Sequence, residues 1–172
     1  MARAGHLVRR FVGSLRPGGP GGDDEAWVAA LLGQGELELW RRMSGPDRRH
    51  AAAVAHRVER ALGVEATPPV LAAALLHDVG KVAAGLGTYG RVVATVAGTV
   101  AGRGMAASWS RSRGFTRSVG LYLRHAELGA DMLRLAGSDP LTVAWAAEHH
   151  DPPDRWTVPG RVAEALEAAD DD

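Results

Sequence analysis

Apolar and polar positions along the chain repeat with the spacing of amphipathic helices, and no stretch shows the strict alternation that a half-buried strand requires. The pattern therefore predicts an all-α fold, a bundle of about seven helices. Glycine and proline positions mark where these helices begin and end. The segments predicted to be helical are residues 25–32, 36–43, 46–62, 68–80, 119–123, 125–136, 141–150 and 159–170.

The segment from Leu71 to Leu76 differs from the other predicted helices because it is apolar on every side. A helix of this kind is normally surrounded by the rest of its domain. It leads into His77 and Asp78, and burying two such polar groups without partners would cost about 2–7 kcal/mol each. A bound cation is the most direct way to offset that cost.

The helix over residues 46–62 places its two histidines in different surroundings. Its apolar stripe comprises Val54, Val58, Ala61 and Leu62. His50 lies four residues before Val54, so it is expected to face the core. His56 lies about 120° away from the stripe and is expected to meet solvent.

The last three helices add further polar groups to packed faces. One stripe comprises His125, Leu128, Gly129, Met132, Leu135 and Ala136. His149 and His150 lie about 100° apart on a helix, so both reach one site only near a helix end. The prolines from Pro152 onward supply that end, although the pair could also be one ligand and one surface histidine. Asp170 follows Leu166 by four residues and can also face inward.

The organisation of the chain is read from its Gly- and Pro-rich stretches. Residues 1–22 carry four arginines and no acid, which predicts a flexible basic tail and Gly/Pro linker before a single domain over residues 23–172. The Gly-rich segment 82–103 is expected to hold one irregular helix and a mobile crossover. The longest apolar run, residues 92–102, is too short to span a bilayer, and no secretory signal is present, so the expected location is the cytoplasm.

Composition and charge narrow the chemistry. The chain has no cysteine, so any metal ion must be held by its seven histidines and its carboxylates. The formal net charge is zero, yet residues 79–126 contain no acid, six arginines and Lys81, the only lysine of the chain. This distribution indicates an anionic small molecule as partner. An arginine-rich solvated surface is the alternative, and Lys81 could simply close a helix.

Seven inward-facing imidazoles and carboxylates come from five predicted helices. Any one of them could be a hydrogen-bonded core residue, but five helices delivering such groups together predict a shared metal centre. Nitrogen and oxygen ligands suit two divalent ions, with Fe or Mn foremost and Zn, Ni, Co or Mg as alternatives. The predicted ligands are His50, His77, Asp78, His125, His149, His150 and Asp170.

Residues 44–170 resemble the HD-domain metal-dependent phosphohydrolase superfamily. The resemblance lies in an H…HD…D framework made by His50, the run from His77 to Lys81, and Asp170. An element similar to HPxxGA at residues 125–130 and the histidine pair at 149–150 resemble the binuclear branch. HD-GYP phosphodiesterases and HD-type dinucleoside-tetraphosphate hydrolases share parts of this pattern. Here Ala126 replaces the usual proline, Pro46 replaces a glutamate of trinuclear sites, and no DGxGYP loop follows, so neither a third metal nor cyclic di-GMP is expected.

The resemblance implies hydrolysis of a phosphoester or phosphoanhydride in a small, nucleotide-like substrate by a metal-bridging hydroxide. Asp78 and Lys81 would be catalytic, Asp78 as the bridge between ions and Lys81 as a ligand of phosphoryl oxygens. Arg117 and Arg124 are expected to bind substrate. Trp109 or Tyr122 could stack on a base, and packing in the core is the alternative for both. The alternative is a non-catalytic HD-like sensor or protein-interaction module. Nucleic-acid binding through the arginines lacks a recognition motif.

Overall fold

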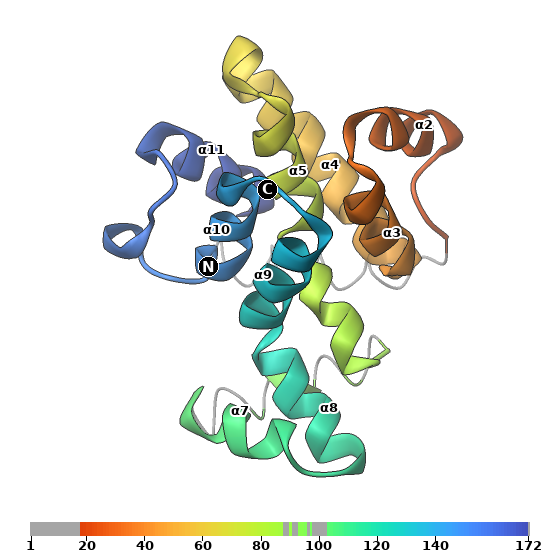
Figure 1. Ribbon diagram of the computed structural model, residues 1–172, viewed down its shortest axis with the longest axis vertical. Helices are drawn as coiled ribbons and strands as arrows, with labels where there is room; N and C mark the ends of the chain where they lie inside the picture. The colour runs from red at the N-terminus through yellow and green to blue at the C-terminus, as the bar shows by residue number, and fades with distance from the viewer. Residues whose placement is uncertain (1–17, 88–89, 91–92, 96, 98–102, 172) are drawn as a thin grey trace, which may run out of the picture.

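A computed structural model describes residues 18–87, 90, 93–95, 97 and 103–171 of the chain. Every regular element in these residues is helical, so the predicted all-α bundle is confirmed (Figure 1). No helix in this part of the chain is long and apolar enough to cross a membrane. Most of the predicted tail, and much of the Gly-rich segment 82–103, lie outside the described residues.

Outside residues 85–102, short connections join the successive helices. Their bounds are α2 Gly22–Leu31, α3 Gln34–Arg42, α4 Gly45–Leu62, η1 Gly63–Glu65, α5 Pro68–Leu76, η2 Val79–Ala84, α7 Arg103–Ser110, α8 Gly114–Leu123, α9 His125–Ala136, α10 Pro140–Glu148, η3 Pro153–Arg155 and α11 Gly160–Asp171, the η elements being 3-10 helices.

Helix α5 forms the centre of the bundle, as its apolar sequence predicts. Every residue from Val70 to Leu76 is buried. Helices α4 and α10 pack against α5, α11 packs on α4, and α9 packs on both α10 and η2 (Figure 1). The polar residues that follow α5 are therefore placed inside the bundle, where four other elements meet them.

Helix α5 ends at Leu76, four residues earlier than predicted. His77 is its C-terminal cap, Asp78 leaves the helical conformation with φ −97° and ψ 6°, and a 3-10 helix follows. The segment after the helix end lies against α9. The approach is so close that a Cβ added at Gly80 would overlap the carbonyl oxygen of His125. The glycine allows the two backbones to touch, and this contact places the turn at residues 77–78 beside the first residue of α9.

The predicted count of about seven helices is too low. Helix α7 was not predicted at all, and α8 begins at Gly114 rather than near Val119. Both helices pack against each other, and a Cβ at Gly120 would overlap the backbone of Ser110. A glycine that weakens a helix in isolation here permits a close helix pair, so packing outweighs propensity.

His56, expected to meet solvent, keeps 34% of its side chain exposed, while its ring stacks on Trp27 of α2 at 4.3 Å and its Nε2 lies 2.9 Å from Asp24. Two other predictions about helix faces were wrong. Leu135 is 91% exposed while Leu133 is fully buried. Two residues apart means about 200° around a helix, so only one of these leucines can face the core. Ala61 is likewise exposed near the end of α4.

Candidate metal centre

Five elements bring the seven predicted ligands into one cluster. Two groups have all their ligand atoms within 4.8 Å of one another: the first is Asp78, His125, His149 and His150, and the second is His50, His77 and Asp170. Two ligand atoms on opposite sides of one ion, each about 2.1 Å from it, lie about 4.2 Å apart. The distances between ligand atoms within each group are close to this value, so each group could hold one ion. A buried group of imidazoles and carboxylates that could hold metal ions is therefore present.

The carboxylate of Asp78 lies between the two groups. Its Oδ1 atom is 3.3 Å from Nε2 of His125 and 3.9 Å from Nε2 of His149. Its Oδ2 atom is 3.4 Å from Nε2 of His77 and forms an ion pair with Lys81. One carboxylate thus presents a different oxygen to each group, which is the arrangement a bridging ligand needs.

The second group is held together by Asp170 at the end of α11. Its Oδ1 atom lies 2.7 Å from Nε2 of His50 and 3.7 Å from Nε2 of His77. The first turns of α4 and the last turn of α11 supply His50 and Asp170, and α11 packs along α4. Residues 120 positions apart in the chain are joined at this point.

Three of the histidines are oriented in the same way by the chain just before them. Each has Nδ1 in hydrogen-bond contact with the backbone carbonyl three residues earlier, which directs Nε2 into the cluster. The bonds run from His77 to Ala74 (2.9 Å), from His125 to Tyr122 (2.7 Å) and from His149 to Ala146 (3.0 Å). This anchoring fixes both the tautomer and the ring direction that a metal ligand requires.

Two of these directed nitrogens are buried without a hydrogen-bond partner among the described residues. They are Nε2 of His77 and Nε2 of His149, in side chains only 2% and 4% exposed. Asp78 lies near both, at distances where charges interact but no aligned hydrogen bond forms. An unsatisfied buried polar atom costs about 1–3 kcal/mol, and a cation at this place would remove that cost.

The electrostatics of the cluster differ from one imidazole to the next. Burial, followed by the potential of neighbouring imidazoles such as His150, lowers the pKa of His149 well below its usual value. Burial and then His125 lower the pKa of His150 to about 4. Both imidazoles are therefore neutral near pH 7, as ligation requires. Burial would lower the pKa of His77, but Asp78 and then Asp170 outweigh it and raise the pKa to about 9.

Lys81 is tied to the same carboxylate. Burial works against its charge, but the ion pair with Asp78 outweighs burial and raises the pKa of Lys81 above its usual value. Burial would also raise the pKa of Asp78, yet Lys81 and His77 hold that pKa well below its usual value. Asp78 is therefore an anion and Lys81 a cation throughout the neutral range.

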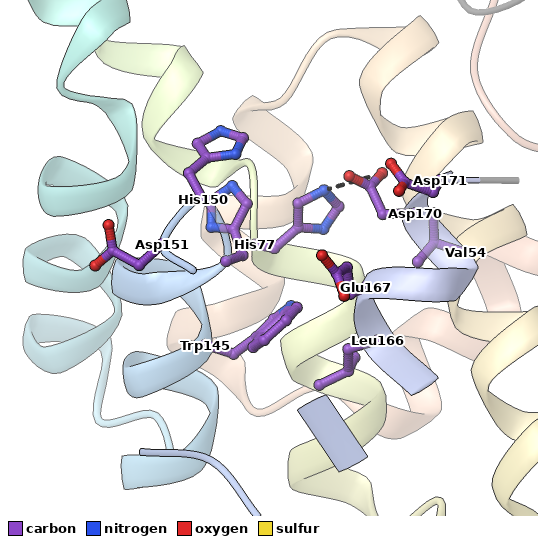
Figure 2. Close-up of a pocket in the computed structure, with 10 residues that line it drawn as sticks. Val54, His77, Trp145, His150, Asp151, Leu166, Glu167, Asp170 and Asp171 are labelled. Carbon is purple, nitrogen blue, oxygen red and sulfur yellow. Dashed lines mark ion pairs between the residues drawn. The ribbon is translucent and has the colours of Figure 1, made fainter. Parts of the chain in front are cut away.

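A pocket of about 270 Å³ opens beside the cluster (Figure 2). His77, His149, His150 and Asp170 border it, and Trp145 with Leu166 provides apolar surface. The other polar residues of its wall are acidic rather than basic. They are Asp151, Glu167 and Asp171.

The two arginines expected to bind substrate do not line this pocket. Arg117 is exposed on α8, and Arg124 bonds Glu127 at 2.7 Å and Ser110 at 3.3 Å. The aromatic residues expected to hold a base do not line it either. Tyr122 nevertheless packs against His125 with ring centroids 5.7 Å apart, so it lies next to the cluster on the other side.

Two residues that support the site were not singled out from the sequence. Trp145 precedes His149 by four residues, a helical spacing that could have revealed it. Glu148 is buried, and its carboxylate accepts hydrogen bonds from the backbone amide and the hydroxyl of Thr157 and from the backbone amide of Val158. It thereby fastens the loop after the histidine pair, and no local sequence signal marks that long-range role.

No protein-family model, no curated protein and no solved structure matches this chain.

Proposed function

We propose that the chain is a metal-dependent phosphohydrolase that cleaves a phosphoester or phosphoanhydride of a small, nucleotide-like substrate. The observation that carries the proposal is the convergence of seven nitrogen and oxygen ligands from five elements, two of them buried imidazole nitrogens without a hydrogen-bond partner among the described residues. Structural histidines normally satisfy both ring nitrogens. Here the helices satisfy Nδ1 and direct Nε2 to a common point.

The ligand geometry favours two ions. His125, His149 and His150 with one oxygen of Asp78 would hold the first, and the remaining group would hold the second together with the other oxygen of Asp78. The absence of sulfur and the mixture of imidazole and carboxylate favour Fe or Mn, with Zn, Ni, Co or Mg as alternatives.

Divalent ions in such a site would supply a water of lowered pKa and neutralise charge on the phosphoryl group. The residues of the chain have distinct parts in this scheme. Asp78 would hold the two ligand groups at a fixed separation through its two oxygens. Lys81 stays protonated beside it and would stabilise negative charge that develops on phosphoryl oxygens.

The pocket limits which part of a substrate can lie next to the ions. Its acidic wall would repel additional phosphates, so a phosphate chain is expected to extend toward Lys81 instead. Carboxylates accept hydrogen bonds from hydroxyl groups, and Trp145 offers an aromatic surface. A sugar or nucleoside group on the leaving side fits this lining.

The test combines metal content with hydrolysis. Protein purified without added metal is assayed by elemental analysis, then supplied with Mn²⁺ or Fe²⁺ and screened against bis(p-nitrophenyl) phosphate and a nucleotide panel. His77→Ala and Asp78→Ala should lose both metal and hydrolysis, whereas His56→Ala, a histidine outside the cluster, should keep both.

Two results would contradict the proposal. Full metal content in Asp78→Ala would remove the bridging role of that carboxylate. A metal-loaded, folded wild-type protein that hydrolyses none of the phosphoesters and phosphoanhydrides would instead support the non-catalytic sensor.

A further inference from the structure

The pair of helices α7 and α8, with residues 111–113 between them, forms an end of the molecule without acidic residues; we call residues 103–123 the α7–α8 hairpin. No aspartate or glutamate occurs between residues 79 and 126. Arg111, Arg113 and Arg117 are all exposed on this hairpin. Within the described part of the chain none of the three pairs with a carboxylate, which leaves their charge available to a partner.

Two exposed arginines on other helices, unlike the three on the hairpin, form ion pairs with acids. Arg134 lies 2.6 Å from Asp131, and Arg161 lies 3.1 Å from Glu65. The distribution of charge on this molecule is therefore uneven although its formal net charge is zero. An uncompensated basic surface attracts an anionic partner over about one Debye length, roughly 8–10 Å.

The same end of the molecule exposes large apolar side chains. Phe115 on α8 is 53% exposed and Met105 on α7 is 44% exposed. The other exposed hydrophobics of this size among the described residues are Val64, Val93 and Leu135. Exposed apolar side chains that gather at one end of a molecule mark an interaction surface.

The position of the hairpin leaves it accessible. Helices α7 and α8 pack mainly on each other, and α8 also packs on η2. Figure 1 shows the pair at the lower end of the long axis, apart from α2, α4 and α11. Phe115 lies in the first turn of α8, and the exposed residues Arg113 and Arg117 stand two positions before and after it in the chain.

We propose that the α7–α8 hairpin docks on the surface of an anionic phospholipid bilayer. Basic side chains near a membrane are attracted by anionic headgroups, and apolar side chains at the same surface enter the headgroup–acyl boundary. Nucleic acid would pair with the arginines, but it offers no apolar environment to the aliphatic side chain of Met105. The combination of aliphatic, aromatic and arginine side chains therefore favours lipid. This inference does not depend on the proposed hydrolysis.

The test is cosedimentation of the full chain with vesicles. We expect binding to vesicles of 70% phosphatidylcholine and 30% phosphatidylglycerol, weak binding to pure phosphatidylcholine, and loss of binding in 0.5 M salt. Arg111→Gln/Arg113→Gln/Arg117→Gln should weaken the partition coefficient roughly fivefold per arginine at low salt. Phe115→Ser should weaken it as well, because its ring no longer enters the interface.

Matched controls lie on other faces of the molecule. Arg60→Gln/Arg134→Gln/Arg161→Gln removes the same charge, and Leu135→Ser removes an apolar side chain that is even more exposed than Phe115; both variants should bind like the wild type. A tail variant, Arg3→Gln/Arg9→Gln/Arg10→Gln/Arg16→Gln, measures the contribution of the basic N-terminal segment. The proposal is overturned if the hairpin variants bind vesicles as the wild type does. It is also overturned if duplex DNA is bound at least as tightly and Phe115→Ser changes neither affinity.

Discussion

At the scale of single residues, the cluster depends on how each imidazole is oriented, not only on where it lies. The sequence could place His50, His77, His125 and Asp170 on inward faces because each stands at a helical spacing from apolar residues or at a helix end. It could not show that Nδ1 of His77 and of His149 is bound to a carbonyl one turn earlier. That bond depends on rotamers, which a pattern of residue types does not contain.

Lys81 provides a test of the chemistry at this scale. We expect Lys81→Met to keep its metal content and to lose about 10²–10³-fold in turnover, because a charge that stabilises the phosphoryl group is removed while the ligands remain. Lys81→Arg retains the charge and should recover part of the activity. Elemental analysis and steady-state rates on the same samples provide the comparison, and parallel loss of metal and rate would make Lys81 a structural partner of Asp78.

At the scale of elements, the sequence predicted the helices with clear apolar stripes and terminal signals. Helix α10 begins at Pro140 after the Asp139 cap, and α4 begins near Pro46 after the Ser44 cap. It did not predict α7, nor the early end of α5. Both depend on glycines that allow close backbone contacts, Gly120 and Gly80, and such contacts lie between segments that are separate in the sequence.

The contact at Gly80 yields a prediction of its own. In Gly80→Ala the new methyl group would overlap the carbonyl of His125, so η2 and α9 must move apart. We expect a loss of about 1–3 kcal/mol in the free energy of unfolding. Metal affinity should fall too, since Asp78 and His125 are displaced relative to each other. Denaturant unfolding and metal titration measure the two effects.

Gly160→Ala is the matched control, because a Cβ at that position meets nothing within 4 Å. It should leave both unfolding and metal titration unchanged. Wild-type metal affinity in a stably folded Gly80→Ala variant would show that the α9 contact does not position the ligands.

At the scale of the whole molecule, the cluster joins segments from residue 50 to residue 170. The order of helices could be read from the chain, but their arrangement around α5 could not, because each apolar face is compatible with several partners. The acidic pocket wall is a consequence of that arrangement, since α11 and the loop after α10 meet only in the folded bundle.

Metal removal should therefore affect the stability of the entire bundle. A ligand present at about 1,000 times its dissociation constant adds about 4 kcal/mol of stability, which corresponds to roughly 8–16 °C in Tm for a chain of this size. We expect Tm to fall by that amount when the protein is treated with a chelator, and to recover with Mn²⁺. Calorimetry on the wild type and on Asp78→Ala checks this, since the variant should show no response; an unchanged wild-type Tm would argue against metal at the cluster.

The turn after α5 has one more consequence. His77 and Asp78 are neighbours in the chain, yet they belong to different ligand groups, and Asp78 contacts both. An ion that fixes His77 and Asp78 at one ligand group would also hold them in the position that an ion at the other group needs. Occupancy at the two positions would then be cooperative, and the half-loaded protein would be a minor species during titration.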